Sequence, residues 1–153
     1  MEGNGGNTLY EFTGVYDHAL DVKGRLTLPA AFRTHVNHAA PAKIMISTSR
    51  QSVAIFPVPA FRKFLDKLNR LPRTDPRVAA VRNTLTALTY DCEVDRQGRL
   101  LIPPKLRELA GINRDVAVVG NIETVDVWDR ARWNECLRSG LDQLPANSQG
   151  LDI

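Results

Sequence analysis

Apolar and polar residues alternate along several short stretches of this chain, a pattern that is typical of half-buried β-strands. Most of these stretches are bounded by glycine, proline or a polar turn. The strands predicted in this way cover residues 12–20, 25–28, 43–47, 52–56, 89–94, 99–102, 116–119 and 124–128. So many short strands favour a fold in which β-structure dominates.

Between the strands, apolar residues recur every three or four positions, which places them on one face of an α-helix. Pro59 suits the first turn of one such helix, and Asp75-Pro76 and Asp129 are typical helix starts. Gly111 is expected to end a short helix, because glycine adopts the left-handed backbone at a helix end at little cost. The helices predicted in this way cover residues 30–36, 60–71, 76–88, 104–111 and 130–138.

The chain repeats itself. The motif Asp-x-x-Gly-Arg begins at Asp21 and again 74 positions later at Asp95, each time followed by a strand and a proline. The two stretches read Asp21-Val-Lys-Gly-Arg25-Leu-Thr-Leu-Pro29 and Asp95-Arg-Gln-Gly-Arg99-Leu-Leu-Ile-Pro103. Phe56 and Trp128 also correspond, but 72 positions apart, so about two residues are missing between the last two strands of the second copy. This self-similarity indicates a duplicated supersecondary unit.

Each copy of the unit is interpreted as two hairpins with short helices, the first hairpin turning at the Asp-x-x-Gly-Arg motif. One such unit cannot bury both faces of its strands, whereas two units related by a pseudo-two-fold axis can interlock into a small closed barrel without exposed edges. The predicted fold class is therefore α+β, mainly β: a pseudo-two-fold barrel of two halves with short flanking helices. The predicted boundaries are a disordered leader over residues 1–9, a first half over 12–73, a linking helix over 74–88, a second half over 89–138 and a flexible tail over 139–153.

Composition and charge narrow the class of protein. The chain has 153 residues, of which 43% are hydrophobic and 24% charged, values that are ordinary for a soluble domain. No apolar run approaches the roughly 20 residues of a membrane span, so a cytoplasmic protein without a membrane partner is expected. Residues 1–75 carry ten Lys/Arg against six Asp/Glu, and residues 76–153 carry ten against eleven. This bias fits a polyanion partner on the first half, and equally fits solvated surface charge.

The two motif turns are the candidate site. An architectural interpretation is that Asp21 accepts hydrogen bonds from turn amides and that Arg25 reaches back to it, with Asp95 and Arg99 alike. A functional interpretation is that each turn presents two cations, which suit phosphate contact and, for arginine, guanine recognition. The candidate DNA-binding residues are Lys23, Arg25, Arg96 and Arg99, and the structural residues of the motif are Asp21, Gly24, Asp95 and Gly98.

Other chemistry has less support. Paired aspartates at a pseudo-two-fold axis could share a proton, but the cation beside each motif aspartate would keep it ionised. His35 and His38 have no third metal ligand at a suitable spacing, and neither Cys92 nor Cys136 has a nearby histidine. No catalytic residue, metal, cofactor or small-molecule substrate is therefore expected.

These motifs carry a resemblance. The stretch Phe12-x-Gly-x-Tyr-x-His-x-Leu-Asp21-x-Lys-Gly-Arg-Leu-x-Leu-Pro29, together with the second copy from Asp95 to Pro103, resembles the MraZ family. This family belongs to the AbrB/MazE class of swapped-hairpin transcription factors with SpoVT-AbrB domains. The likeness runs from about Phe12 to Leu137, which is most of the chain.

The resemblance implies a double-split β-barrel of two AbrB-like halves, assembled into a ring of many subunits. It also implies a nucleoid-associated regulator, usually a repressor, that binds short G-rich direct repeats upstream of the division and cell-wall gene cluster. The DNA-facing turns then fall on Lys23 and Arg25 in the first half and on Arg96 and Arg99 in the second. The alternative is an antitoxin-like or scaffold barrel that binds a partner protein and touches DNA only incidentally.

Overall fold

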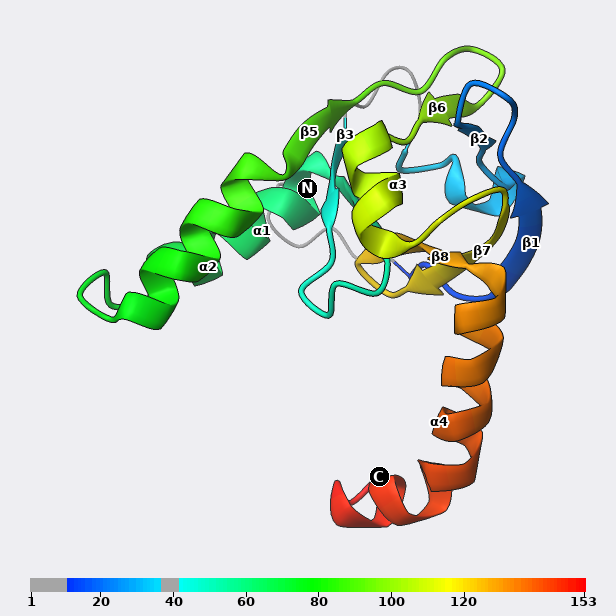
Figure 1. Cartoon of the computed structure of the whole chain (residues 1–153). Coiled ribbons are helices and arrows are strands. Elements are labelled where there is room, and N and C mark those ends of the chain that lie inside the picture. Colours follow the sequence, from blue (N-terminus) through cyan, green and yellow to red (C-terminus); the bar gives the residue numbers. More distant parts are fainter. Residues whose placement is uncertain (1–10, 37–41) are drawn as a thin grey trace, which may run out of the picture.

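A computed structural model describes residues 11–36 and 42–153 of the chain. These residues form an α+β fold in which an antiparallel sheet dominates (Figure 1). The disordered leader expected over residues 1–9, and His38, lie outside the described residues. No helix in the described part of the chain is long and apolar enough to cross a membrane.

The main sheet has six strands in the order β1-β7-β8-β4-β3-β5, and β2 and β6 form a separate two-stranded ribbon. Every predicted strand is present, with ends that differ from the prediction by a few residues. The strands are β1 (Val15–Ala19), β2 (Arg25–Thr27), β3 (Ala42–Ile46), β4 (Val53–Pro57), β5 (Thr89–Cys92), β6 (Arg99–Leu101), β7 (Asp115–Asn121) and β8 (Thr124–Asp129).

The first predicted hairpin of each copy is confirmed only next to its turn, where the N–H of Asp21 donates to Arg25 O, the N–H of Asp95 donates to Arg99 O, and Val94 forms a bridge with Leu100. Farther along the strands the prediction is wrong. β1 pairs with β7 and β5 pairs with β3, so neither runs alongside the strand that follows it. β2 pairs instead with β6 of the other copy, where Leu26 lies opposite Leu100. This exchange buries both leucines, which are 0% and 1% exposed, whereas an isolated two-stranded hairpin would leave one face of each strand in water.

The strand pairings obey a pseudo-two-fold symmetry. Leu26 pairs with Leu100 and Ala54 with Asp126, and each pair joins equivalent positions of the two copies. The turn after β3 is closed by Ile46 and Val53, and the equivalent turn after β7 is two residues shorter, as predicted from the change in repeat offset. β1 and β5 end the strand order, so the pairings of the described residues do not close the predicted barrel.

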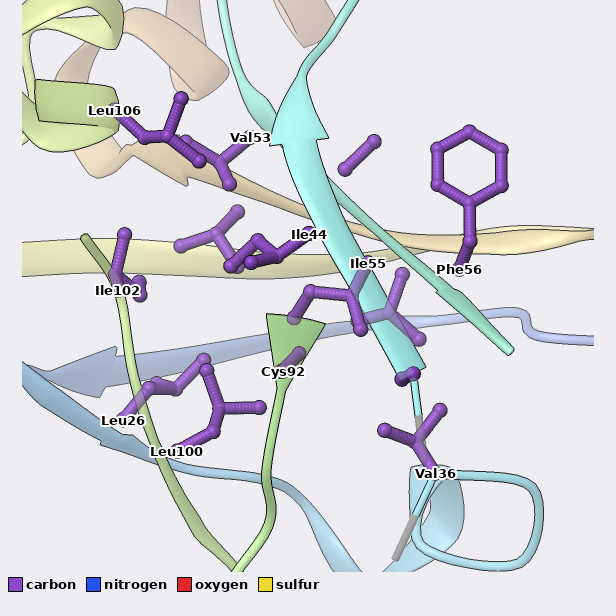
Figure 2. Packing of buried hydrophobic residues seen from close by; sticks show 14 of the residues in the cluster. Leu26, Val36, Ile44, Val53, Ile55, Phe56, Cys92, Leu100, Ile102 and Leu106 are labelled. Carbon is purple, nitrogen blue, oxygen red and sulfur yellow. The ribbon is translucent and has the colours of Figure 1, made fainter. Parts of the chain in front are cut away.

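A single hydrophobic core lies between the two copies. Figure 2 shows side chains from both copies in it, among them Leu26, Ile44 and Ile55 from the first and Leu100 and Ile102 from the second. Each of these residues is at most 1% exposed. Burying one such side chain contributes about 1.5–3 kcal/mol, so each copy depends on the other for its stability.

The predicted helices are also present. They are α1 (Val58–Asn69), α2 (Pro76–Ala87), α3 (Pro104–Ala110) and α4 (Arg130–Gly150), with a 3-10 turn, η2 (Ala30–Phe32), where a longer helix was expected. Asp75 and Asp129 cap α2 and α4 by accepting the backbone N–H of Arg77 and Arg132. Gly111 ends α3 with φ of 68°, as its position predicts.

The C-terminal end of the chain differs from the prediction. The chain is expected to fray from Ser139 and to form a flexible tail, yet α4 continues to Gly150 and includes Pro145. The polar residues support helix locally, as Gln143 does by donating to the Ser139 hydroxyl one turn earlier. No residue of α4 is buried, and the helix projects away from the sheet (Figure 1).

Candidate nucleic-acid interface

The first motif turn is organised by the Asp21 carboxylate. Its Oδ1 accepts the backbone N–H groups of Lys23 and Arg25, both at 2.9 Å. Its Oδ2 accepts Nε of Arg25 at 2.7 Å. One carboxylate therefore holds the turn backbone and the arginine side chain together, as the architectural interpretation predicts.

The second motif turn repeats this geometry. Oδ1 of Asp95 accepts the backbone N–H groups of Gln97 and Arg99 at 2.9 Å, and its Oδ2 accepts Nε of Arg99 at 3.0 Å. Gly24 and Gly98 have φ of 81° and 79°, a conformation that other residues adopt at a steric cost. The two turns thus share the same hydrogen bonds and the same glycine conformation, and the structural roles of Asp21, Gly24, Asp95 and Gly98 stay a prediction.

Hydrogen bonding keeps both carboxylates ionised. The backbone N–H of Arg25, assisted by its side chain and by the N–H of Lys23, lowers the pKa of Asp21 from 3.8 to about 2. The same kind of contacts, led by the backbone N–H of Arg99, lowers the pKa of Asp95. Neither group is protonated near neutral pH, so a shared-proton pair has no basis here.

The four candidate cations lie at the surface to different degrees. Lys23 and Arg96 are exposed. Arg25 and Arg99 are about one-third exposed, at 32% and 33% of their side chains, because each is paired with its aspartate. The pairing uses Nε, and within the described part of the chain the terminal nitrogens of both arginines make no hydrogen bond. Those nitrogens can still fork onto a ligand.

The exposed face of the β2–β6 ribbon joins the two turns. Side chains alternate along a strand, so the burial of Leu26 and Leu100 turns Arg25 and Arg99 outward. Thr27 and Leu101 share this outer face, opposite Arg99 and Arg25 respectively, and Leu101 is 51% exposed. These two residues are not among the predicted site residues, although the alternation along the two strands indicates them.

The groove beside the second half contains both signs of charge. It has a volume of about 610 Å³ and is lined by Arg25, Arg99, Glu93 and Asp95, among other residues. Asp91 also lines it but is paired with Lys43. Arg25, Arg99 and Leu101 belong both to this groove and to the outer face of the ribbon, so a polyanion bound there would also lie close to the acidic side chains of the groove.

The remaining candidate groups do not form a second site. Burial raises the pKa of the Cys92 thiol to about 12, which makes it unreactive. Burial also raises the pKa of Asp126, which accepts hydrogen bonds from Thr124 and Asn121 inside the sheet. Within residues 11–36 and 42–153, no group of three His, Cys, Asp or Glu side chains lies close enough to hold a metal ion.

Known proteins resemble this chain over most of its length. The family model of the MraZ protein, described as antitoxin-like, matches residues 12–83 and 85–147. A protein of Moorella thermoacetica is 39% identical over 138 residues, which cover 88% of this chain and 92% of that protein. A protein of Herpetosiphon aurantiacus is 34% identical over 135 residues, with the same coverage of both chains. A third, from Salinispora tropica, is 34% identical over 140 residues, covering 92% of this chain and 96% of the relative.

All three relatives are named "Transcriptional regulator MraZ". The matched residues include both motif turns, the β2–β6 ribbon and the sheet that carries them. By the extent of these matches, the chain belongs to the MraZ family.

Proposed function

We propose that this protein is a sequence-specific DNA-binding transcriptional regulator that contacts DNA through the outer face of the β2–β6 ribbon and its two motif turns. The observation that carries the proposal is the symmetry of the cations. Two equivalent Asp-x-x-x-Arg turns flank one exposed ribbon and present Lys23, Arg25, Arg96 and Arg99. The relatives' names, which describe regulators and not enzymes, support the same function.

The dimensions of the ribbon suit the major groove. A two-stranded ribbon fits a groove about 12 Å wide. The ribbon has three residue pairs, so its turns are separated by about 10 Å along the strands. In this proposal the exposed cations Lys23 and Arg96 contact phosphates, whereas the terminal nitrogens of Arg25 and Arg99 fork onto guanine O6 and N7. This division of roles fits a preference for short G-rich sites.

We further propose that several subunits assemble into a ring and that their ribbons bind successive direct repeats of the DNA. Contacts from one ribbon alone bind weakly at cellular salt, but each further contact made within one assembly raises the overall affinity, by about 10²–10⁴ in total. The repeats proposed are those upstream of the division and cell-wall gene cluster, and the proposed outcome is repression at the nucleoid. The proposal also includes a closed barrel formed by the two halves, which the strand pairings of the described residues leave open.

Two exposed apolar surfaces support the assembly. Leu137, Leu141 and Leu144 form a stripe on α4, and each is exposed. A groove of about 460 Å³ lies between α2 and the turn after β3, with Val81 and Leu88 among its lining residues. Residues 139–153 carry two Asp and no Lys/Arg, whereas residues 70–88 carry four Arg and one Asp. Residues 139–153, which include Leu141 and Leu144, are thus acidic and residues 70–88 are basic, while Arg138 adds a positive charge beside Leu137.

The α4 helix of one subunit is proposed to fill the groove of the neighbouring subunit. Within one subunit, α4 is held away from this groove, because Arg130 donates to His18 O at 2.7 Å and Arg132 donates to Ala110 O at 3.2 Å. A contact between two different surfaces repeats from subunit to subunit, and it closes into a ring when the rotation between neighbouring subunits allows. In the antitoxin-like alternative, an unrelated partner protein binds in this groove.

A binding titration tests the proposed function. Fluorescence anisotropy on duplex DNA from upstream of the protein's own gene should show that Arg25→Ala binds at least tenfold more weakly than wild type, the loss typical of one base-reading arginine. Arg62→Ala, which removes an exposed cation from α1, should change affinity little. Wild-type affinity in Arg25→Ala would remove the mechanism, and affinity that does not change between roughly 50 and 200 mM salt would favour the antitoxin-like alternative.

A further inference from the structure

Arg33 and Arg107 occupy equivalent positions in the two copies, 74 residues apart, and are not among the predicted site residues. Nε of Arg33 donates to Leu28 O at 2.9 Å, and Nε of Arg107 donates to Ile102 O at 3.1 Å. Both side chains are half-buried. Each arginine is therefore hydrogen-bonded to the first residue after the ribbon strand of its own copy. That residue is Leu28 after β2 and Ile102 after β6.

Each arginine also lies against the motif turn of the other copy. A Cβ atom added to Gly24 would lie 2.6 Å from Cζ of Arg107, and one added to Gly98 would lie 2.5 Å from Cζ of Arg33. Such distances are too short for real contacts, so the guanidinium group fills the space that a side chain at the glycine would need. The positive φ makes a larger residue strained at each glycine, and a side chain there would also have to displace the guanidinium group.

Backbone hydrogen bonds complete the connection between the copies. The N–H of Leu28 donates to Gly98 O at 2.8 Å, and the N–H of Ile102 donates to Gly24 O at 3.2 Å. Arg107 is thus hydrogen-bonded to the carbonyl of Ile102, and the N–H of Ile102 donates to Gly24 O. The guanidinium group of Arg107 also packs on Gly24. The turn that carries Lys23 and Arg25 is supported by the second copy, and the turn that carries Arg96 and Arg99 is supported by the first.

We propose that Arg33 and Arg107 are positioning residues of the DNA interface, each of which sets the motif turn of the other copy. This inference rests on the proposed function and extends it: each turn is supported by the other copy, so that neither half presents its cations correctly alone. The half-buried guanidinium groups act through the turns and not by contacting DNA.

The variant Arg107→Lys tests this role, because it keeps the charge but loses the planar group and its Nε hydrogen bond. DNA affinity should fall about tenfold, the effect of losing roughly one hydrogen bond's worth of free energy. In Arg107→Gln, which removes the charge, the slope of log affinity against log salt should stay at the wild-type value. A slope reduced by about one in Arg107→Gln would mean a direct phosphate contact and would overturn the positioning role, as would unchanged affinity in Arg107→Lys.

Double-mutant cycles identify which turn each arginine serves. Arg107→Lys combined with Lys23→Ala should be non-additive, because both act on the first turn, whereas Arg107→Lys combined with Arg96→Ala should be additive. Arg33→Lys is the matched control and should give the reverse pattern. Coupling of Arg107 to Arg96 in its own copy would contradict the inference.

A measurement without DNA separates this inference from the proposed function. Amide hydrogen exchange in Arg107→Lys should accelerate in residues 21–25 and not in 95–99, and Arg33→Lys should do the opposite. Exchange that is unchanged in both turns would overturn the inference even if DNA binding is real. Selective acceleration in a protein that does not bind DNA would instead refute the proposed function and leave the coupling of the turns standing. If one variant fails to fold, the other gives the mirrored readout.

Discussion

At the scale of single residues, the motif aspartates organise the candidate site. Each carboxylate accepts two backbone N–H groups and one arginine Nε, so it sets the shape of the turn and the direction of the cation at once. The architectural and functional interpretations of the motif are therefore compatible. An arginine held through Nε keeps its terminal nitrogens for a ligand and loses less side-chain entropy on binding.

The lowered pKa of Asp21 predicts a pH dependence. Its pKa is about 2 in the folded protein against an ordinary value of 3.8. Because the folded value is the lower one, the stability that this carboxylate contributes is present above about pH 4 and is lost as pH falls through about 2. The difference in free energy of unfolding between wild type and Asp21→Asn should follow this curve in urea titrations.

Asp142→Asn, which changes an exposed carboxylate outside the motif turns, is the matched control variant for the urea titrations. A stability difference between wild type and Asp21→Asn that is constant from pH 2 to pH 7 would contradict the role given to the carboxylate.

At the scale of elements, the β2–β6 ribbon depends on its inward face. Three residue pairs are too few for an independent ribbon, and Leu26 and Leu100 anchor it in the shared core. The sequence predicted both strands from their alternation but paired them with the wrong neighbours. Alternation specifies which face of a strand is buried, and it is the same whether the partner strand is near in sequence or in the other copy.

Removing either anchor should have the same effect. Leu26→Ala and Leu100→Ala should each lower the free energy of unfolding by about 2–5 kcal/mol, because a large buried side chain is lost at equivalent positions. Both should shift one single transition in urea, monitored by circular dichroism and by tryptophan fluorescence. Val22→Ala, at an exposed turn position, should leave the transition unchanged.

Two separate transitions, or a loss confined to one of the leucine variants, would contradict a core shared by both copies.

At the scale of the whole molecule, the two copies form one body with a single core and two apolar surfaces left open. The α4 helix has no buried residue, although helices of its length gain most of their stability from packing. A partner surface for the leucine stripe would supply that packing. The stripe was not predicted from the sequence, because the polar residues around it favoured a flexible tail.

Placing charge in the stripe should break the assembly. The double variant Leu141→Glu/Leu144→Glu should elute as a smaller species than wild type in size-exclusion chromatography with light scattering. Its affinity for DNA with several repeats should fall by about 10²–10⁴, and its affinity for a single site should stay the same. Gln143→Glu lies off the stripe and serves as the matched control. An unchanged mass for the double variant would exclude α4 from the subunit contact.

The sequence by itself determined the duplicated unit, the strands, the helix starts at Asp75 and Asp129, and the hydrogen-bonded turns at Asp21 and Asp95, because these follow from local patterns and from short-range hydrogen bonds. Only the tertiary structure decided that β2 pairs with β6 and that Arg33 and Arg107 lie under the turns of the opposite copy. Those contacts join residues 65 positions or more apart, and the hydrophobic pattern of one strand carries no information about which distant strand will cover it.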